Sequence, residues 1–123
     1  MLMKSPLLVR ALTVAIALAF TSNAKAAGIY PQHAPTFEVI SNTYLDGASD
    51  WSRHYYALEF VAGLRRTLQP NIAVLEARGL PNLKSAFEQT SSACKSTEDE
   101  LIAKIQVARS RFVAALAKSR KRR

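Results

Sequence analysis

The feature that most constrains the fold is a run of apolar residues at helical spacing between Asp50 and Pro70. Its members lie three or four positions apart and are Trp51, Tyr55, Leu58, Val61, Leu64 and Leu68. This period places them on one face of an α-helix, for which Asp50 supplies the N-cap. Pro70 is expected to end the helix, because a proline ring blocks the helical hydrogen bond. The chain must therefore bury one face of this helix against other elements.

Shorter helices are predicted on both sides of this segment. Thr36 can cap a helix that ends at Gly47 and carries its apolar residues on one face, namely Phe37, Ile40 and Tyr44. After Pro70, a brief helix is expected to close at Gly79, where a left-handed turn suits glycine. Pro81 then begins another helical segment, which is predicted to end at a polar break over residues 90–92.

The last helix has the clearest start signal in the chain. Thr97 lies three residues before Glu100, so hydroxyl and carboxylate can cap each other's free amides. The helix then presents a regular apolar stripe made of Leu101, Ile105, Ala108, Phe112 and Ala115. No segment has the pattern of a strand, so the fold predicted is an all-α, small four- to five-helix bundle with short connections.

The N-terminus has the composition of an export signal. Lys4 and Arg10 supply a basic start, residues 11–20 an apolar run, and residues 22–26 a polar stretch that ends in small side chains. A transmembrane helix needs about 20 apolar residues, which is more than this run offers, so no transmembrane anchor is expected.

Cleavage after Ala26 is predicted, with Ala24 as the alternative position. Residues 1–26 would then be a signal peptide, followed by an extended lead-in over 27–35 and a helical domain over 36–117. Pro31 and Pro35 argue against regular structure in the lead-in. The mature protein is expected in the periplasm or outside the cell.

Positive charge is concentrated at the C-terminus. Residues 27–117 hold nine basic and nine acidic residues, whereas the tail, residues 118–123, adds Lys118, Arg120, Lys121, Arg122 and Arg123. Nucleic-acid-binding domains spread such residues over a face or groove, so nucleic acid is not the expected partner. The tail is expected either to be a solvated terminus or to bind polyanions at an anionic envelope surface.

Residues that carry chemistry are sparse. Asp50 and His54 can meet on one helix face, but zinc needs three or four ligands, and no HExxH motif, phosphate loop or GxSxG elbow is present. Cys94 is the single cysteine and could be a buried apolar residue, half of an intermolecular disulfide or a reactive thiol. We therefore predict no enzymatic activity, no metal and no cofactor.

Four aromatic residues crowd one helix and form the candidate partner-binding site: Trp51, Tyr55, Tyr56 and Phe60. They occupy more than one side of the helix, so they cannot all face one core. One flank is expected to be exposed as a protein contact, because rigid aromatic side chains cover area at low entropic cost. The alternative is that helices pack on both flanks and bury all four.

A short helix ending in Tyr-Leu-Asp-Gly (residues 44–47), followed by a helix with Phe-Val-Ala-Gly-Leu (residues 60–64), resembles a known family. It is similar to the small helical periplasmic immunity proteins that neutralise type VI secretion amidase effectors. This resemblance implies a protein that occludes the active site of a toxin. The predicted function is thus that of an exported, non-enzymatic helical binding protein, and the alternative is a cationic envelope-surface protein acting through its tail.

Overall fold

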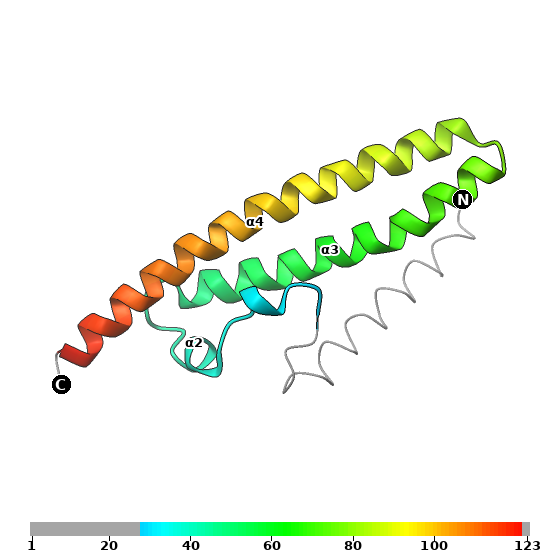
Figure 1. The fold of residues 1–123 in the computed structure, drawn as a ribbon. Coiled ribbons are helices and arrows are strands. Elements are labelled where there is room, and N and C mark those ends of the chain that lie inside the picture. The colour runs from blue at the N-terminus through cyan, green and yellow to red at the C-terminus, as the bar shows by residue number, and fades with distance from the viewer. Residues whose placement is uncertain (1–27, 122–123) are drawn as a thin grey trace.

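Two long antiparallel helices make up most of the molecule. The computed structural model describes residues 28–121, in which α3 (Ala48–Ala77) and α4 (Pro81–Lys121) form a hairpin (Figure 1). Two short elements precede it, the 3-10 turn η3 (Pro31–His33) and the helix α2 (Phe37–Ser41). No strand occurs among the described residues, so the all-α prediction is confirmed.

The described chain folds into fewer and longer helices than the predicted bundle of four to five. Pro70 is predicted to end the first long helix, but α3 continues through it to Ala77. A proline inside a helix removes one backbone hydrogen bond and strains the turn before it, which packing on both sides can offset. Leu68 and Leu75 are buried on either side of Pro70 and supply that packing.

The predicted break and restart between residues 90 and 97 are also absent, because α4 is continuous there. The threonine hydroxyls bond to carbonyls of the preceding turn instead of capping a new helix, Thr90 to Ala86 at 2.9 Å and Thr97 to Ala93 at 3.0 Å. Ser91 is buried and accepts a hydrogen bond from the side-chain amide of Gln69 in α3 at 2.7 Å. The segment from Thr97 to Glu100, which has the pattern of a capping box, therefore lies within one continuous helix.

The turn between the two long helices forms where it was predicted, at Gly79 and Pro81. Gly79 has a positive φ of 68°, and its N–H donates to the carbonyl of Glu76 at 3.1 Å. The next N–H, that of Leu80, donates to the carbonyl of Leu75 at 3.0 Å, which completes a Schellman motif. Pro81 is the first residue of α4, where its missing N–H costs nothing.

The segment before α3 is only partly as predicted. Thr36 caps α2 by accepting a hydrogen bond from the N–H of Val39 at 3.3 Å. Val39 is the buried residue of α2, however, whereas the predicted apolar face of Phe37, Ile40 and Tyr44 is exposed. Gly47 does not end this helix, since α2 stops at Ser41, and Gly47 is instead the N-cap of α3, with Asp50 in the first turn.

The core lies in the half of the hairpin where α3 begins and α4 ends. Its buried members come from α2 and both long helices and are Val39, Ala48, Trp51, Tyr55, Leu58, Leu101, Ile105, Ala108 and Phe112. The rings of Trp51 and Phe112 meet edge to face with centroids 6.1 Å apart. Most of the predicted stripe of the last helix is thus core, and only Ala115 is half-buried.

The other half of the hairpin buries fewer side chains. Between the core and the Gly79 turn, the buried residues are Ala62, Leu68 and Leu75 from α3 and Ser91, Cys94 and Glu98 from α4. The predicted signal peptide over 1–26 lies outside the described residues, as do Arg122 and Arg123.

Candidate functional site

The structure divides the four predicted contact aromatics into two groups. Trp51 and Tyr55 are only 6% and 7% exposed and belong to the core. The indole N–H of Trp51 donates to the carbonyl of His33 at 2.9 Å, and the Arg109 guanidinium stacks over the same ring at 4.9 Å. These two residues therefore cannot form a contact surface without unfolding, and their predicted partner-binding role is corrected to packing.

Tyr56 and Phe60 remain as surface aromatics. They are 58% and 52% exposed and lie one helical turn apart on α3. Gly63 and Val74 fall on the same side of the helix by their spacing, and nothing within 4 Å would meet a side chain added at Gly63. We call Tyr56, Phe60, Gly63 and Val74 the α3 outer face. The ring of Tyr56 packs edge to face against that of Tyr55, with centroids 5.6 Å apart, and about half of each of the two outer side chains is open to solvent.

The predicted extended lead-in is a strap, residues 28–35, that is tied to both long helices. The carboxylate of Glu59 accepts the N–H of Ile29 at 2.7 Å and that of Tyr30 at 2.9 Å. From α4, Arg109 donates to the carbonyl of Gln32 at 3.1 Å. The strap contains η3 and is otherwise irregular, and four of its backbone polar groups bond to side chains of the hairpin.

A buried ionic cluster lies beneath the strap. Glu98 is fully buried, and its carboxylate accepts hydrogen bonds from two nitrogens of Arg65 and from the hydroxyl of Tyr30, the last at 2.7 Å. Burial alone would raise the pKa of Glu98, but the hydrogen bonds from Arg65 and Tyr30 outweigh it and hold this pKa below its usual value. The bond to Glu98 raises the pKa of Tyr30 in turn.

This cluster has the buried carboxylate with a shifted pKa that is typical of catalytic sites, but its hydrogen bonds join the strap, α3 and α4 to one another. Both oxygens of Glu98 are occupied by Arg65 and Tyr30. Cys94, one turn away, is buried, and burial raises the pKa of its thiol, which favours the unreactive form. Of the alternatives predicted for Cys94, burial as an apolar residue fits this position.

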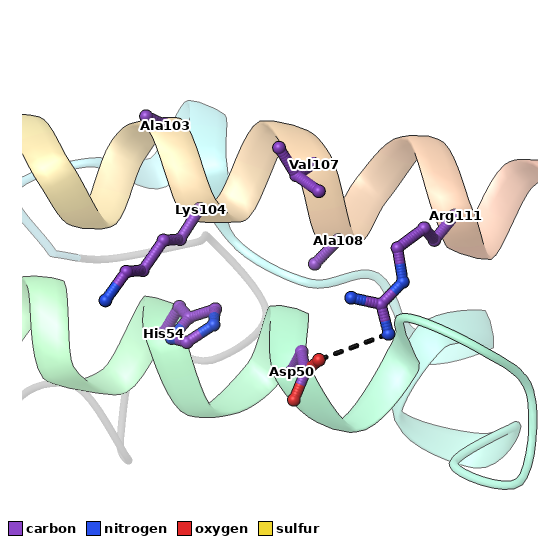
Figure 2. Close-up of a pocket in the computed structure, with 7 residues that line it drawn as sticks. All are labelled: Asp50, His54, Ala103, Lys104, Val107, Ala108 and Arg111. Atoms are coloured by element: carbon purple, nitrogen blue, oxygen red, sulfur yellow. Dashed lines mark ion pairs between the residues drawn. The ribbon is translucent and has the colours of Figure 1, made fainter.

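A shallow groove of about 370 Å³ opens between α3 and α4. Figure 2 shows its lining, which consists of Asp50, His54, Ala103, Lys104, Val107, Ala108 and Arg111. The cyan ribbon of the N-terminal segment runs behind the two helices in this view, so the groove opens on the other face of the hairpin.

The charges at the groove are unevenly paired. Asp50 does not bond to His54 as the sequence allows, but pairs with Arg53 at 2.8 Å and with Arg111 at 3.3 Å. Arg111 is also held by Asp46, with its Nε at 3.0 Å from the carboxylate. Burial, followed by the charge of Arg53, lowers the pKa of His54 below its ordinary value.

The predicted basic tail is not a separate element where it is described. Its first four residues continue α4, which ends at Lys121. Arg120 pairs with Glu38 of α2 at 3.1 Å, so it tethers the end of the long helix to the short one. Lys118 and Lys121 are exposed.

Sequence reasoning missed Glu59, Glu98 and Arg65, because no local pattern marks a residue whose partner is 29 to 68 positions away. Among the described residues, no cluster of ligating side chains could hold a metal ion, and no helix is long and apolar enough to cross a membrane. No protein-family model matches the sequence, and neither the curated proteins nor the solved structures include a significant match.

Proposed function

We propose that this chain is an exported, non-enzymatic binding protein that covers a surface of a partner protein with the α3 outer face. The observation that carries the proposal is the exposure of Tyr56 and Phe60, at 58% and 52%, on a rigid helix. Aromatic side chains on a preformed helix bury large areas at little entropic cost and are enriched at binding hot spots. The open space at Gly63 lets a partner backbone approach the helix closely.

The partner class that we propose is a secreted enzyme whose active site is occluded. This rests on the similarity of residues 44–47 and 60–64 to immunity proteins against amidase effectors. Such an inhibitor is expected to be encoded beside its toxin, so the product of a toxin-like neighbouring reading frame is the partner to test. Phe60 belongs to both the similar segment and the outer face.

Binding of that product is measured by isothermal titration calorimetry. The Tyr56→Ala and Phe60→Ala variants are each expected to weaken it by about 30-fold, as hot-spot truncations worth about 2 kcal/mol do. Phe37→Ala and Tyr44→Ala are matched controls, because these aromatics are 84% and 74% exposed but lie outside α3. Unchanged affinity in both outer-face variants, with unchanged helicity, would refute the proposed surface.

Export is tested separately. Mass spectrometry of the protein from the envelope fraction is expected to show a new N-terminus between Lys25 and Gly28. An intact N-terminus in a membrane pellet would contradict cleavage.

A second candidate function is binding to anionic envelope surfaces through the tail. The exposed lysines in the last turns of α4, Lys118 and Lys121, favour it. Deleting residues 118–123 is then expected to abolish binding to anionic vesicles, with little loss of helicity, and the binding of the intact protein is expected to weaken as salt rises. Retention of vesicle binding after the deletion would exclude the tail as the site.

A further inference from the structure

The groove between α3 and α4 offers a second surface that the proposed function does not use. Its lining comes from one stretch of each helix, Asp50 to His54 and Ala103 to Arg111. It differs from the α3 outer face in character, because polar side chains line one part and small apolar side chains another.

Two nitrogen groups in the groove have no bonded partner among residues 28–121. Among the ion pairs of the described residues none includes Lys104, and no hydrogen bond to the ring of His54 is present there. Figure 2 shows the Lys104 side chain reaching from α4 toward α3 beside that ring. An anionic group that entered here would meet an ammonium group and an imidazole together.

The other charged groups at the groove leave this pair available. Asp50 is engaged by Arg53 and Arg111, so its negative charge is largely balanced. Arg111 in turn is held by Asp46, which fixes its position at the end of the groove. The charged groups that act on the ring of His54 are Asp50, Arg53, Lys104 and Arg111, three of which are cations.

The remaining lining is apolar and suits a short hydrocarbon body. Ala103, Val107 and Ala108 form it, and Val107 is more than half exposed although it lies on the groove. Val107 therefore has apolar surface that a ligand could cover. A volume of about 370 Å³ is at the lower end of the range for ligand sites.

We propose that this groove binds a carboxylate with a short apolar body, with the carboxylate between His54 and Lys104 and the apolar body against Val107. The carboxylate belongs either to a small organic acid or to an acidic side chain of a protein. Charge complementarity selects the anion, and the alanines and valine select against a fully hydrated one such as phosphate.

Binding is expected to strengthen as the pH falls toward the pKa of His54, because protonation adds a second positive charge to the site. The bound anion raises that pKa in return. The chain has two histidines, and His33 lies on the strap and does not line the groove, so it serves as an internal reference in the same spectrum.

The test follows the imidazole proton signals of both histidines by NMR while hexanoate is added. Hexylamine has the same body with the opposite charge, phosphate is an anion without the body, and a blocked tripeptide with one glutamate represents a protein source. The expected result is a saturable shift at His54 but not at His33, with affinity at least fivefold weaker in Lys104→Gln and unchanged in Lys121→Gln.

The two sources are separated by which of hexanoate and the tripeptide binds more tightly, and binding of either supports the proposal. The proposal is overturned if neither shifts the His54 signal saturably below 50 mM, or if Lys104→Gln binds as the unaltered protein does. It is also overturned if phosphate or hexylamine binds as tightly as hexanoate. Circular dichroism checks that the variants, both changed at exposed positions, remain folded.

Discussion

Replacing Gly47 by alanine is expected to be far more damaging than the size of one methyl group suggests. Gly47 begins α3 with a φ of 86°, a conformation that costs a residue with a side chain about 1–2 kcal/mol. A Cβ added there would also lie 2.8 Å from the amide nitrogen of Phe112 and closer still to the carbonyl oxygen of Ala108. These two atoms belong to the backbone of α4, so no side chain can rotate away.

The magnitude follows from adding the two effects. Forcing an extra carbon into a packed backbone contact costs about 1–3 kcal/mol, so Gly47→Ala is expected to lose about 2–5 kcal/mol of unfolding free energy in total. Gly79→Ala carries the conformational cost alone, because its φ is also positive but nothing lies within 4 Å. Gly63→Ala is expected to gain about 0.5–1 kcal/mol, since Gly63 is helical and open.

Urea unfolding followed by circular dichroism at 222 nm measures the three variants against the unaltered protein. The expected order of stability is Gly63→Ala, unaltered, Gly79→Ala and Gly47→Ala. If Gly47→Ala loses no more unfolding free energy than Gly79→Ala does, the backbone at Gly47 does not lie in close contact with α4 and the reasoning is refuted. If Gly47→Ala does not fold at all, Gly47→Asn, which tolerates positive φ but still carries the Cβ, separates the two costs.

Three further predictions concern the hairpin. Pro70→Ala is expected to raise the unfolding free energy by up to about 3 kcal/mol, because it restores a helical N–H and removes a steric conflict, and a loss in urea unfolding would contradict this. Leu58→Ala is expected to lose about 2–5 kcal/mol and Tyr56→Ala less than about 0.5, whereas equal losses by the same assay would place Tyr56 in the core. Because the folded pKa of Glu98 is lowered, its contribution is complete above the unfolded pKa of about 4.3 and is lost as the pH falls through the folded value. Stability measured from pH 6 to pH 2 should therefore fall more steeply in the unaltered protein than in Glu98→Gln, and parallel curves would show that this carboxylate is not perturbed.

Local signals predicted the structure well where neighbouring residues carry the whole cause. The Gly79 turn, the Thr36 cap and the stripe from Leu101 to Phe112 depend on contacts within a few positions or on simple helical period. The same kind of signal failed at Thr97, because a capping box works only where a helix has reason to start, and here the preceding residues are already helical.

The polar sites could not be predicted for a different reason. Nothing in the residues next to Glu98 indicates a buried ion pair, and only the pairing of the helices shows that it faces Arg65, 33 positions earlier. The groove likewise joins His54 to Lys104, which are adjacent only because α3 and α4 run antiparallel. The helical period predicted that one aromatic flank of α3 would be exposed. The burial of Trp51 depends on its contacts with Phe112 and with the strap, which are distant in the sequence.

The buried ion pair also decides how the two long helices are aligned. In a hairpin whose facing surfaces are mostly apolar, an alignment of α4 shifted along α3 by one heptad would still bury a hydrophobic stripe. Such a slide would carry Glu98 away from Arg65 and place it beside Leu58 or Ile72, where a charge has no partner. An uncompensated buried charge costs several kcal/mol, so the alternative alignments are penalised far more than the native one is stabilised. Glu98 and Arg65 thus act together with the short Gly79 turn to select one register of the hairpin.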